Sequence, residues 1–214
     1  MPPKPKFTRE DIVAAAFEIT REGGIEAVVA REVGRRLNTS VSPIFSMFSG
    51  MDELRREVYF RARQRCVEYL GECLRFFPAF KAFGLRWIRF AQEEPHLFRL
   101  LFWSGRLQGS FPERIVEEYP GVMEPLLREI EKEFALENTD ARRLLRHMLI
   151  QANGIASLLL CSEAEFSETE ISRSLSESCM AMVFYLKLKA GSFDPAMAGC
   201  MMGETDRLPE EKRG

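Results

Sequence analysis

The sequence predicts an all-α fold, with an N-terminal three-helix bundle that contains a helix-turn-helix and a larger helical domain behind it. Apolar residues recur at the spacing of a helix, as Ile12, Ala15, Ala16 and Ile19 do near the start of the chain. Glycine and proline residues separate one such segment from the next. No alternation typical of a strand and no internal repeat stands out. These observations favour helices packed on helices.

The composition is that of an ordinary soluble protein. Of the 214 residues, 46% are hydrophobic and 29% are charged. No run of about 18 apolar residues is present, so we expect no membrane span. The opening MPPKPKFTRED lacks the apolar segment of a secretory signal. The five cysteines are dispersed without a C-x-x-C pair, which favours reduced thiols and a cytoplasmic location.

Charge is distributed unevenly, although the net charge is only −2. Residues 1–65 carry twelve Lys and Arg against nine Asp and Glu, a net of +3, which leaves −5 for the rest. A mildly basic front and an acidic back fit a DNA-binding head on an acidic body. We therefore expect a head at 1–50, a second domain at 51–190 and a polar, frayed tail at 191–214.

The first helix carries a signal at each end. Thr8 is followed three residues later by Asp11, which is close to a capping box. Gly23 and Gly24 end the helix. A long helix is expected to begin near Met51, beyond the segment described next.

The stretch from 27 to 54 predicts two short helices joined by a tight turn. Val33 gives the first of them an inward face, and Gly34 supplies the small side chain that lets the second helix cross closely. Asn38 follows four residues later and tolerates a left-handed backbone. Ile44 is apolar and placed to lock the second helix onto the first.

Two residues mark the start of the second short helix. Ser40 can cap it, and Pro43 lies within its first turn, where a missing N–H costs little. This is the pattern of a helix-turn-helix, whose second helix enters the DNA major groove. The alternative is that any two short helices joined by a polar turn share the pattern.

The arrangement resembles a known family. A helix that ends in a glycine turn, then the helix-turn-helix, then F-x-x-x-x-E-L (Phe48, Glu53, Leu54) at the start of a long helix resemble the TetR family of transcriptional regulators across roughly residues 8–55. The segment FGLRWIRFAQEEPHLFRLLF resembles the helix–Pro–helix passage of many family ligand domains. Asn153-Gly154 resembles the His-Gly of a WHG-type C-terminal domain, with Asn in place of His. The resemblance implies a homodimer, a ligand pocket in the second domain, and loss of operator binding when ligand is bound.

The chain departs from the family at four anchors. The family usually has Thr or Ser at Ala30, Tyr at Phe45, His or Tyr at Met47, and Lys at Met51. Four polar or charged anchors have thus become apolar together. Because phosphate contacts supply most non-specific affinity, we expect weaker DNA binding than in a typical relative.

The residues expected on DNA lie in both short helices. Arg31 matches a family place that contacts phosphate or base, and Val41 and Pro43 offer apolar contact to thymine. The full expected set is Arg31, Val41, Ser42, Pro43, Phe45, Ser46 and Met47. The alternative for Val41, Pro43 and Met47 is that they cover the small core.

Aromatic, apolar and polar residues of the second half suggest a pocket for a small apolar effector. The residues expected to line it are Trp87, Phe98, Phe102, Trp103, His147 and Gln151. The alternative is that the aromatic side chains only fill the helical core. A zinc role is not expected, because the two histidines of the chain are far apart in sequence.

The last two long helices, expected at 140–160 and 168–189, carry more apolar surface than one monomer face hides easily. Two helices from each subunit would form a four-helix bundle. The residues expected at the dimer interface are Gly154, Ser157, Leu158, Met180, Val183 and Phe184. The alternative is burial under residues 79–135 of the same chain.

Three functions are therefore weighed. The first is a ligand-responsive transcriptional regulator, with repression as the expected mode, that binds a palindromic operator as a homodimer. The second is a helical ligand-binding or interaction dimer whose DNA head is weakened or lost. An enzyme is the third, and it is not expected, because the sequence contains no Gly-rich phosphate loop, no metal cluster and no paired acid–base motif. No cofactor is implied.

Overall fold

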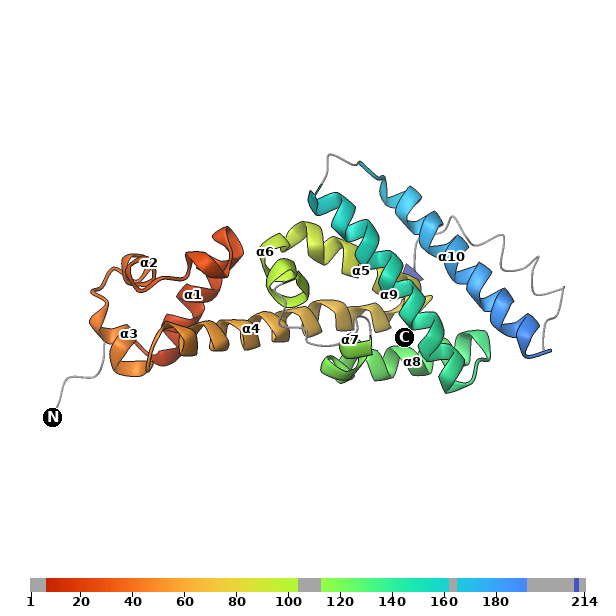
Figure 1. Cartoon of the computed structure of the whole chain (residues 1–214), viewed down its shortest axis with the longest axis horizontal. Coiled ribbons are helices and arrows are strands. Elements are labelled where there is room, and N and C mark those ends of the chain that lie inside the picture. The colour runs from red at the N-terminus through yellow and green to blue at the C-terminus, as the bar shows by residue number, and fades with distance from the viewer. Residues whose placement is uncertain (1–6, 104–112, 162–164, 192–209, 212–214) are drawn as a thin grey trace. The chain divides into compact units, whose positions relative to one another are not determined.

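The protein is all-α, as predicted, in a computed structural model (Figure 1). The structure describes residues 7–103, 113–161, 165–191 and 210–211. They fall into two compact units, Met1–Cys66 with Glu94–Gln108 and Val67–Glu93 with Gly109–Gly214. This division differs from the expected boundary at residue 50, because α4 (Met51–Gly71) is one continuous helix and the units divide within it.

The first unit holds the short helices (red to orange in Figure 1). Its elements are α1 (Arg9–Gly23), η1 (Ile25–Ala27), α2 (Ala30–Arg36), α3 (Ser42–Met47), most of α4, α6 (Pro95–Phe98) and the π-helical turn η3 (Arg99–Trp103). Thr8 caps α1 in a complete capping box with Asp11, and Gly24 ends α1 at a φ of 82°, both as predicted.

One apolar core joins these elements. Its fully buried members include Ile12, Ala16, Val28, Val33, Ile44, Leu54, Val58, Leu97 and Phe98. Residues from α6 take part because α6 packs against α1. The first unit is therefore built from the head and from a segment that follows it by about thirty residues in sequence.

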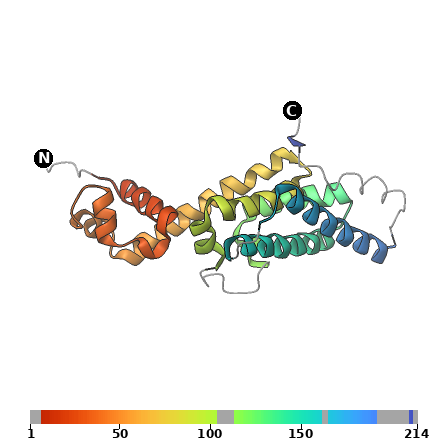
Figure 2. The same cartoon turned by 90° about the horizontal axis from the view of Figure 1, so that it is seen from above.

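The second unit is built around α5 (Ala79–Glu93), which is buried on nearly all sides and packs against α8, α9 and α10 (Figure 2). The other elements are η2 (Glu72–Arg75), β1 (Phe76–Phe77), α7 (Glu113–Glu118), α8 (Pro120–Phe134), α9 (Asn138–Cys161), α10 (Glu168–Lys189) and β2 (Glu210–Glu211). A second complete capping box, formed by Ser167 and Glu170, begins α10.

A two-residue antiparallel pairing corrects one expectation about the tail. Phe76 pairs with Glu211, and Phe77 pairs with Glu210. These two glutamates belong to the segment predicted to be frayed; the structure orders them because the extended backbone of β1 offers free main-chain groups for pairing. Residues 192–209 and 212–214 lie outside the described part of the chain.

α9 is long and apolar enough to be compared with a membrane-spanning helix. An 18-residue window within it has a mean hydropathy of 1.3, which meets the test for a membrane-spanning helix, and 33% of that window is buried in the chain. It is the only described helix that meets this test. Since α9 packs against both α5 and α10, it is consistent with a core helix of a soluble protein.

Candidate functional site

The turn between α2 and α3 passes close to Gly34. A Cβ atom added there would lie 2.9 Å from the backbone oxygen of Thr39, closer than real Cβ atoms approach. The Thr39 N–H donates to the Gly34 carbonyl at 2.9 Å. Asn38 completes the turn at a φ of 52°, in the left-handed region. The left-handed Asn38 is as predicted, whereas the small side chain of Gly34 makes room for the turn at Thr39 and Ser40 rather than for α3.

The start of α3 differs from the prediction in one respect. Pro43 lies in the first turn, as expected. Ser40 does not cap the helix, because α3 begins at Ser42 and the capping position belongs to Val41, which makes no side-chain hydrogen bond to the helix. The backbone of Val41 is already helical, with φ −75° and ψ −14°, so the helical conformation begins one residue after Ser40.

Arg9 ties the end of α3 to α1 and α4, a role that the sequence did not reveal. Its Nη1 donates to the carbonyl of Met47 at 2.6 Å, and its guanidinium lies 4.1 Å from the ring centroid of Phe48. Its Nη2 donates to Glu53 at 2.7 Å and to Glu57 at 2.9 Å. One arginine thus holds the last residue of α3 and two carboxylates of α4.

Glu53 has a strongly stabilised carboxylate at this junction. It accepts hydrogen bonds from the backbone N–H and the hydroxyl of Ser49, each at 2.7 Å, as well as from Arg9. The Ser49 backbone N–H and then the Arg9 guanidinium lower the pKa of Glu53 to about 2. The start of α4 is therefore held by a group that stays ionised at neutral pH.

α3 has a buried side and an exposed side. Ile44 is fully buried and fixes α3 against the first unit, together with Phe48 just beyond it. Val41 is 40% exposed and Phe45 is 53% exposed. The residues Ser42 and Ser46 are exposed, and Pro43 and Met47 are half-buried. Val41 therefore does not cover the core, whereas Pro43 and Met47 do so in part.

Most arginines of the head are neutralised locally. Arg35 pairs with Glu32 at 2.5 Å, and Arg36 pairs with Glu22 at 2.6 Å. Arg55 lies 3.5 Å from Asp52 and donates to the Val28 carbonyl, and Arg61 pairs with Glu10.

Two head arginines differ from this group. Arg31 on α2 and Arg56 on α4 are exposed and form no ion pair with a carboxylate in the described part of the chain. No charged residue occurs from Leu37 to Met51. α3 itself therefore carries no charged side chain.

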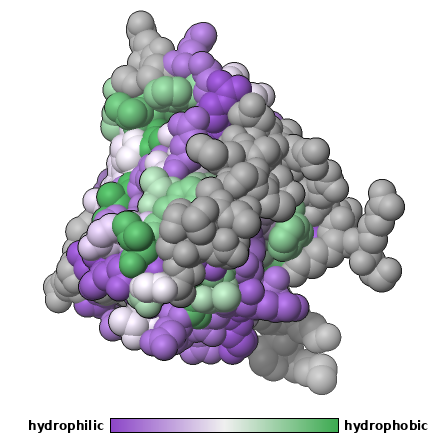
Figure 3. Space-filling view, turned by 90° about the vertical axis from the view of Figure 1, so that its right-hand side faces the viewer, coloured by the Kyte–Doolittle hydropathy of each residue, from purple (hydrophilic) through white to green (hydrophobic). Residues whose placement is uncertain are grey.

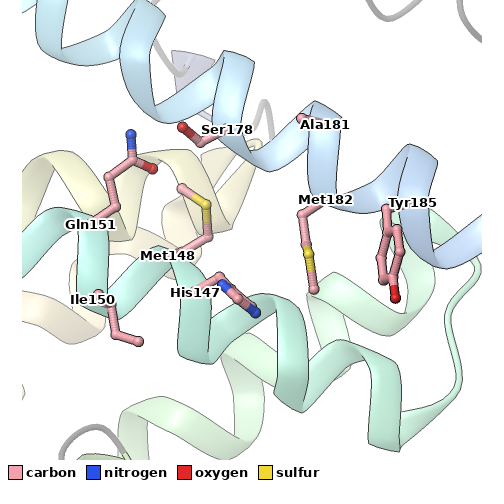
Figure 4. Close-up of a pocket in the computed structure, with 8 residues that line it drawn as sticks. All are labelled: His147, Met148, Ile150, Gln151, Ser178, Ala181, Met182 and Tyr185. Atoms are coloured by element: carbon pink, nitrogen blue, oxygen red, sulfur yellow. The ribbon is translucent and has the colours of Figure 1, made fainter.

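A groove of about 530 Å³ lies between α9 and α10 in the second unit (Figure 4). Its lining residues are His147, Met148, Ile150, Gln151, Ser178, Ala181, Met182 and Tyr185. In Figure 4, Met148 and Gln151 point from α9 toward α10, and Met182 and Tyr185 point from α10 toward α9. Gln151 Nε2 donates to the backbone and hydroxyl oxygens of Ser174, while its buried Oε1 has no hydrogen-bond partner in the described chain.

The six residues expected to bind ligand fall into two groups. Phe98, Phe102 and Trp103 belong to the first unit, where the Phe98 and Phe102 ring centroids are 4.9 Å apart. Trp87 belongs to the second unit and is 1% exposed. Of this set, His147 and Gln151 line the groove. Trp87 and Phe98 are fully buried among side chains of their own units, which is the alternative that the sequence left open.

The residues expected at a dimer interface lie mostly on the outer side of α9 and α10. Gly154 is exposed, and Leu158 is 50% exposed. Ser157, Met180 and Phe184 are half-buried. Val183 does not lie on this side: it is fully buried within its own chain, because α10 packs on α5 as well as on α9.

The same two helices expose further large apolar side chains. Ile150 is 47% exposed, Tyr185 49% and Leu188 67%. Figure 3 views the side on which α10 lies in Figure 1, and there hydrophobic side chains form separate patches among hydrophilic ones. The groove residues of α10 were not predicted, although Ser178, Ala181, Met182 and Tyr185 follow the i, i+3, i+4, i+7 spacing of one helix face.

In the described part of the chain, His, Cys, Asp and Glu side chains form no group of three that could hold a metal ion. No protein-family model matches the chain, and a search of curated proteins finds no significant relative.

Proposed function

We propose that this protein is a ligand-responsive transcriptional regulator that binds its operator as a homodimer and places α3 in the DNA major groove. The observation that carries the proposal is the tight turn between α2 and α3, which passes close to Gly34, with Ile44 buried on the inner side of α3 and Val41 and Phe45 exposed on its outer side. A recognition helix packs against its domain with one side and contacts base edges with the other, and the burial pattern of α3 is compatible with this.

Arg31 and Arg56 supply the phosphate contacts in this proposal. Both are exposed and neither forms an ion pair with a described carboxylate, so binding to a phosphate breaks no existing pair. Each phosphate neutralised in this way releases counterions, which makes binding salt-dependent. Because Arg35, Arg36, Arg55 and Arg61 already pair with carboxylates, the salt dependence should be shallow.

Dimerisation is proposed to occur through α9 and α10. Ile150, Leu158, Tyr185 and Leu188 are all close to half exposed or more. A second copy of the same two helices would cover these side chains and the groove in a four-helix arrangement. A dimer also places two recognition helices about one turn of DNA apart, so that together they contact two half-sites.

Ligand response follows from this arrangement by linkage. A small apolar effector releases DNA only if it binds more tightly to a dimer whose α3 helices are misplaced for the operator. The sequence resemblance is the basis for this part of the proposal.

The second candidate is a helical binding or interaction dimer with a lost DNA head. The pairing of Arg35 with Glu32 and of Arg36 with Glu22 favours it, because these arginines would have to leave their carboxylates to contact phosphate.

The test is selection of bound duplexes from a random library, followed by fluorescence anisotropy at several salt concentrations. The proposal expects the selection to enrich a sequence with two-fold symmetry. It also expects Arg31→Ala to make the slope of log affinity against log salt concentration shallower, by about one for each arginine that the DNA-bound protein loses. Arg128→Ala is the matched control, because Arg128 is an exposed arginine of the second unit. Absence of any enriched sequence would favour the second candidate.

A further inference from the structure

We propose that α3 reads its operator chiefly through the 5-methyl groups of thymine, which Val41 and Phe45 contact. The inference rests on the proposed function, because it concerns the surface that would face the bases. It adds the chemical feature of DNA that this chain recognises.

Val41 and Phe45 form one apolar surface. The backbone N–H of Phe45 donates to the Val41 carbonyl at 3.4 Å, so the two residues are one helical turn apart. Residues with this spacing project from the same side of a helix, with Cβ atoms about 5–6 Å apart. That separation matches one to two base-pair steps of about 3.4 Å each.

The hydrogen-bonding capacity of α3 is small. It contains no Arg, Lys, Asn, Gln, Asp or Glu, the side chains that recognise a base edge by paired or charged hydrogen bonds. Ser46 donates its hydroxyl hydrogen to the Pro43 carbonyl at 2.8 Å. A serine hydroxyl such as that of Ser42 bonds to either kind of base. Hydrogen bonds from α3 therefore distinguish bases poorly.

α3 can therefore distinguish bases mainly by apolar contact, and the major groove offers one apolar group for such a contact. The thymine methyl is the apolar group among the four base edges there. Duplex DNA also fits the charge of this surface, because no carboxylate occurs from residue 37 to 51 to repel phosphate, and the exposed Arg31 precedes it. Sequence preference should therefore follow the positions of thymines.

The experiment uses the duplex that the full-length protein selects from a random library. Each thymine is replaced in turn by deoxyuridine, which removes the methyl group and keeps the hydrogen-bonding edge. We expect about a fourfold loss of affinity at each contacted methyl, at two positions in each half-site. Phe45→Ala and Val41→Ala should each abolish the effect at one of those positions.

Phe60→Ala is the matched control, because Phe60 is 59% exposed on α4 and lies outside α3. This variant should retain wild-type affinity and the full loss on deoxyuridine. Circular dichroism and melting temperature show that each variant remains folded, as expected for exposed positions.

The outcomes separate the two proposals. Specific binding that is indifferent to deoxyuridine, or a deoxyuridine effect that Phe45→Ala and Val41→Ala leave unchanged, overturns the methyl-reading inference and leaves the regulator intact. Failure to enrich any sequence overturns the proposed function. In that case a protein partner becomes the occupant to seek for the apolar surface of Val41 and Phe45.

Discussion

Arg21 holds the carboxylate of Glu94 through two hydrogen bonds, which Arg21 donates from Nε at 2.8 Å and from Nη2 at 2.7 Å. Glu94 is 5% exposed, whereas the Arg21 side chain is 40% exposed. The pair joins α1 to the residue at the N-cap position of α6, 73 positions later in the chain. It raises the pKa of Arg21, mainly through the hydrogen bond to Glu94.

Replacing Arg21 with Met should destabilise the protein, because it leaves the buried Glu94 carboxylate without its donor. We expect about 1–2 kcal/mol, below the value for a fully buried pair since water reaches the arginine. Urea denaturation measures the change. Glu18→Gln is the control, since it removes the other, exposed carboxylate bonded to Arg21 and should cost less than about 0.5 kcal/mol. Equal effects of the two variants would contradict this role.

Gly34→Ala should distort the turn between α2 and α3. The new Cβ would meet the Thr39 backbone oxygen at 2.9 Å, so the turn or the end of α2 must shift. We expect a loss of about 1–3 kcal/mol of stability, with weaker DNA binding. Gly50→Ala is the control, because no atom lies within 4 Å of its added Cβ. A Gly34→Ala protein as stable as Gly50→Ala would show that the close approach of the turn to Gly34 is not required.

Glu53 should contribute stability that disappears in acid. Its pKa of about 2 is below the ordinary value of 4.5, so the contribution is complete above pH 4.5 and is lost as the pH falls toward 2. Glu53→Gln should therefore melt below the wild type at pH 7, and the difference in melting temperature should shrink between pH 4.5 and pH 2. A difference that is constant across this range would show that ionisation of Glu53 is not its source.

Gly154→Ala tests the proposed dimer. Within one chain the added Cβ meets no atom within 4 Å, and replacing a helical glycine should stabilise the subunit by about 0.5–1 kcal/mol. If α9 approaches a second copy closely at Gly154, the same change should raise the dimer dissociation constant at least tenfold. Sedimentation velocity measures the dissociation. Gly121→Ala, at another open position, should leave it unchanged.

The cysteines should differ in reactivity. Cys66 and Cys179 are buried, and burial raises the pKa of both thiols, while Cys73 is buried and Cys161 is exposed. In a Cys200→Ser protein, a thiol reagent should modify Cys161 quickly and the other three only after unfolding. Cys161→Ser in the same background should abolish the fast phase; fast reaction of a second thiol would contradict the buried positions.

Local features followed from the sequence because short-range chemistry determines them. The capping box of Thr8 and Asp11, the left-handed Asn38 and the turn proline Pro43 each depend on residues within a few positions. The need for a small residue at Gly34 was also predicted, although the backbone that approaches it belongs to the turn at Thr39 and Ser40 rather than to the next helix. The all-α class followed from helical periodicity.

Tertiary structure decided the rest. Arg9 contacts Met47 across 38 positions, and no local pattern identifies such a partner. Val183 and Leu188 lie on the same helix, yet one is fully buried and the other 67% exposed, because α10 packs against α5 and α9 with only part of its surface in the described chain. Composition shows that a residue is apolar, but the packing of the chain decides which apolar side chains form its core and which remain for a partner.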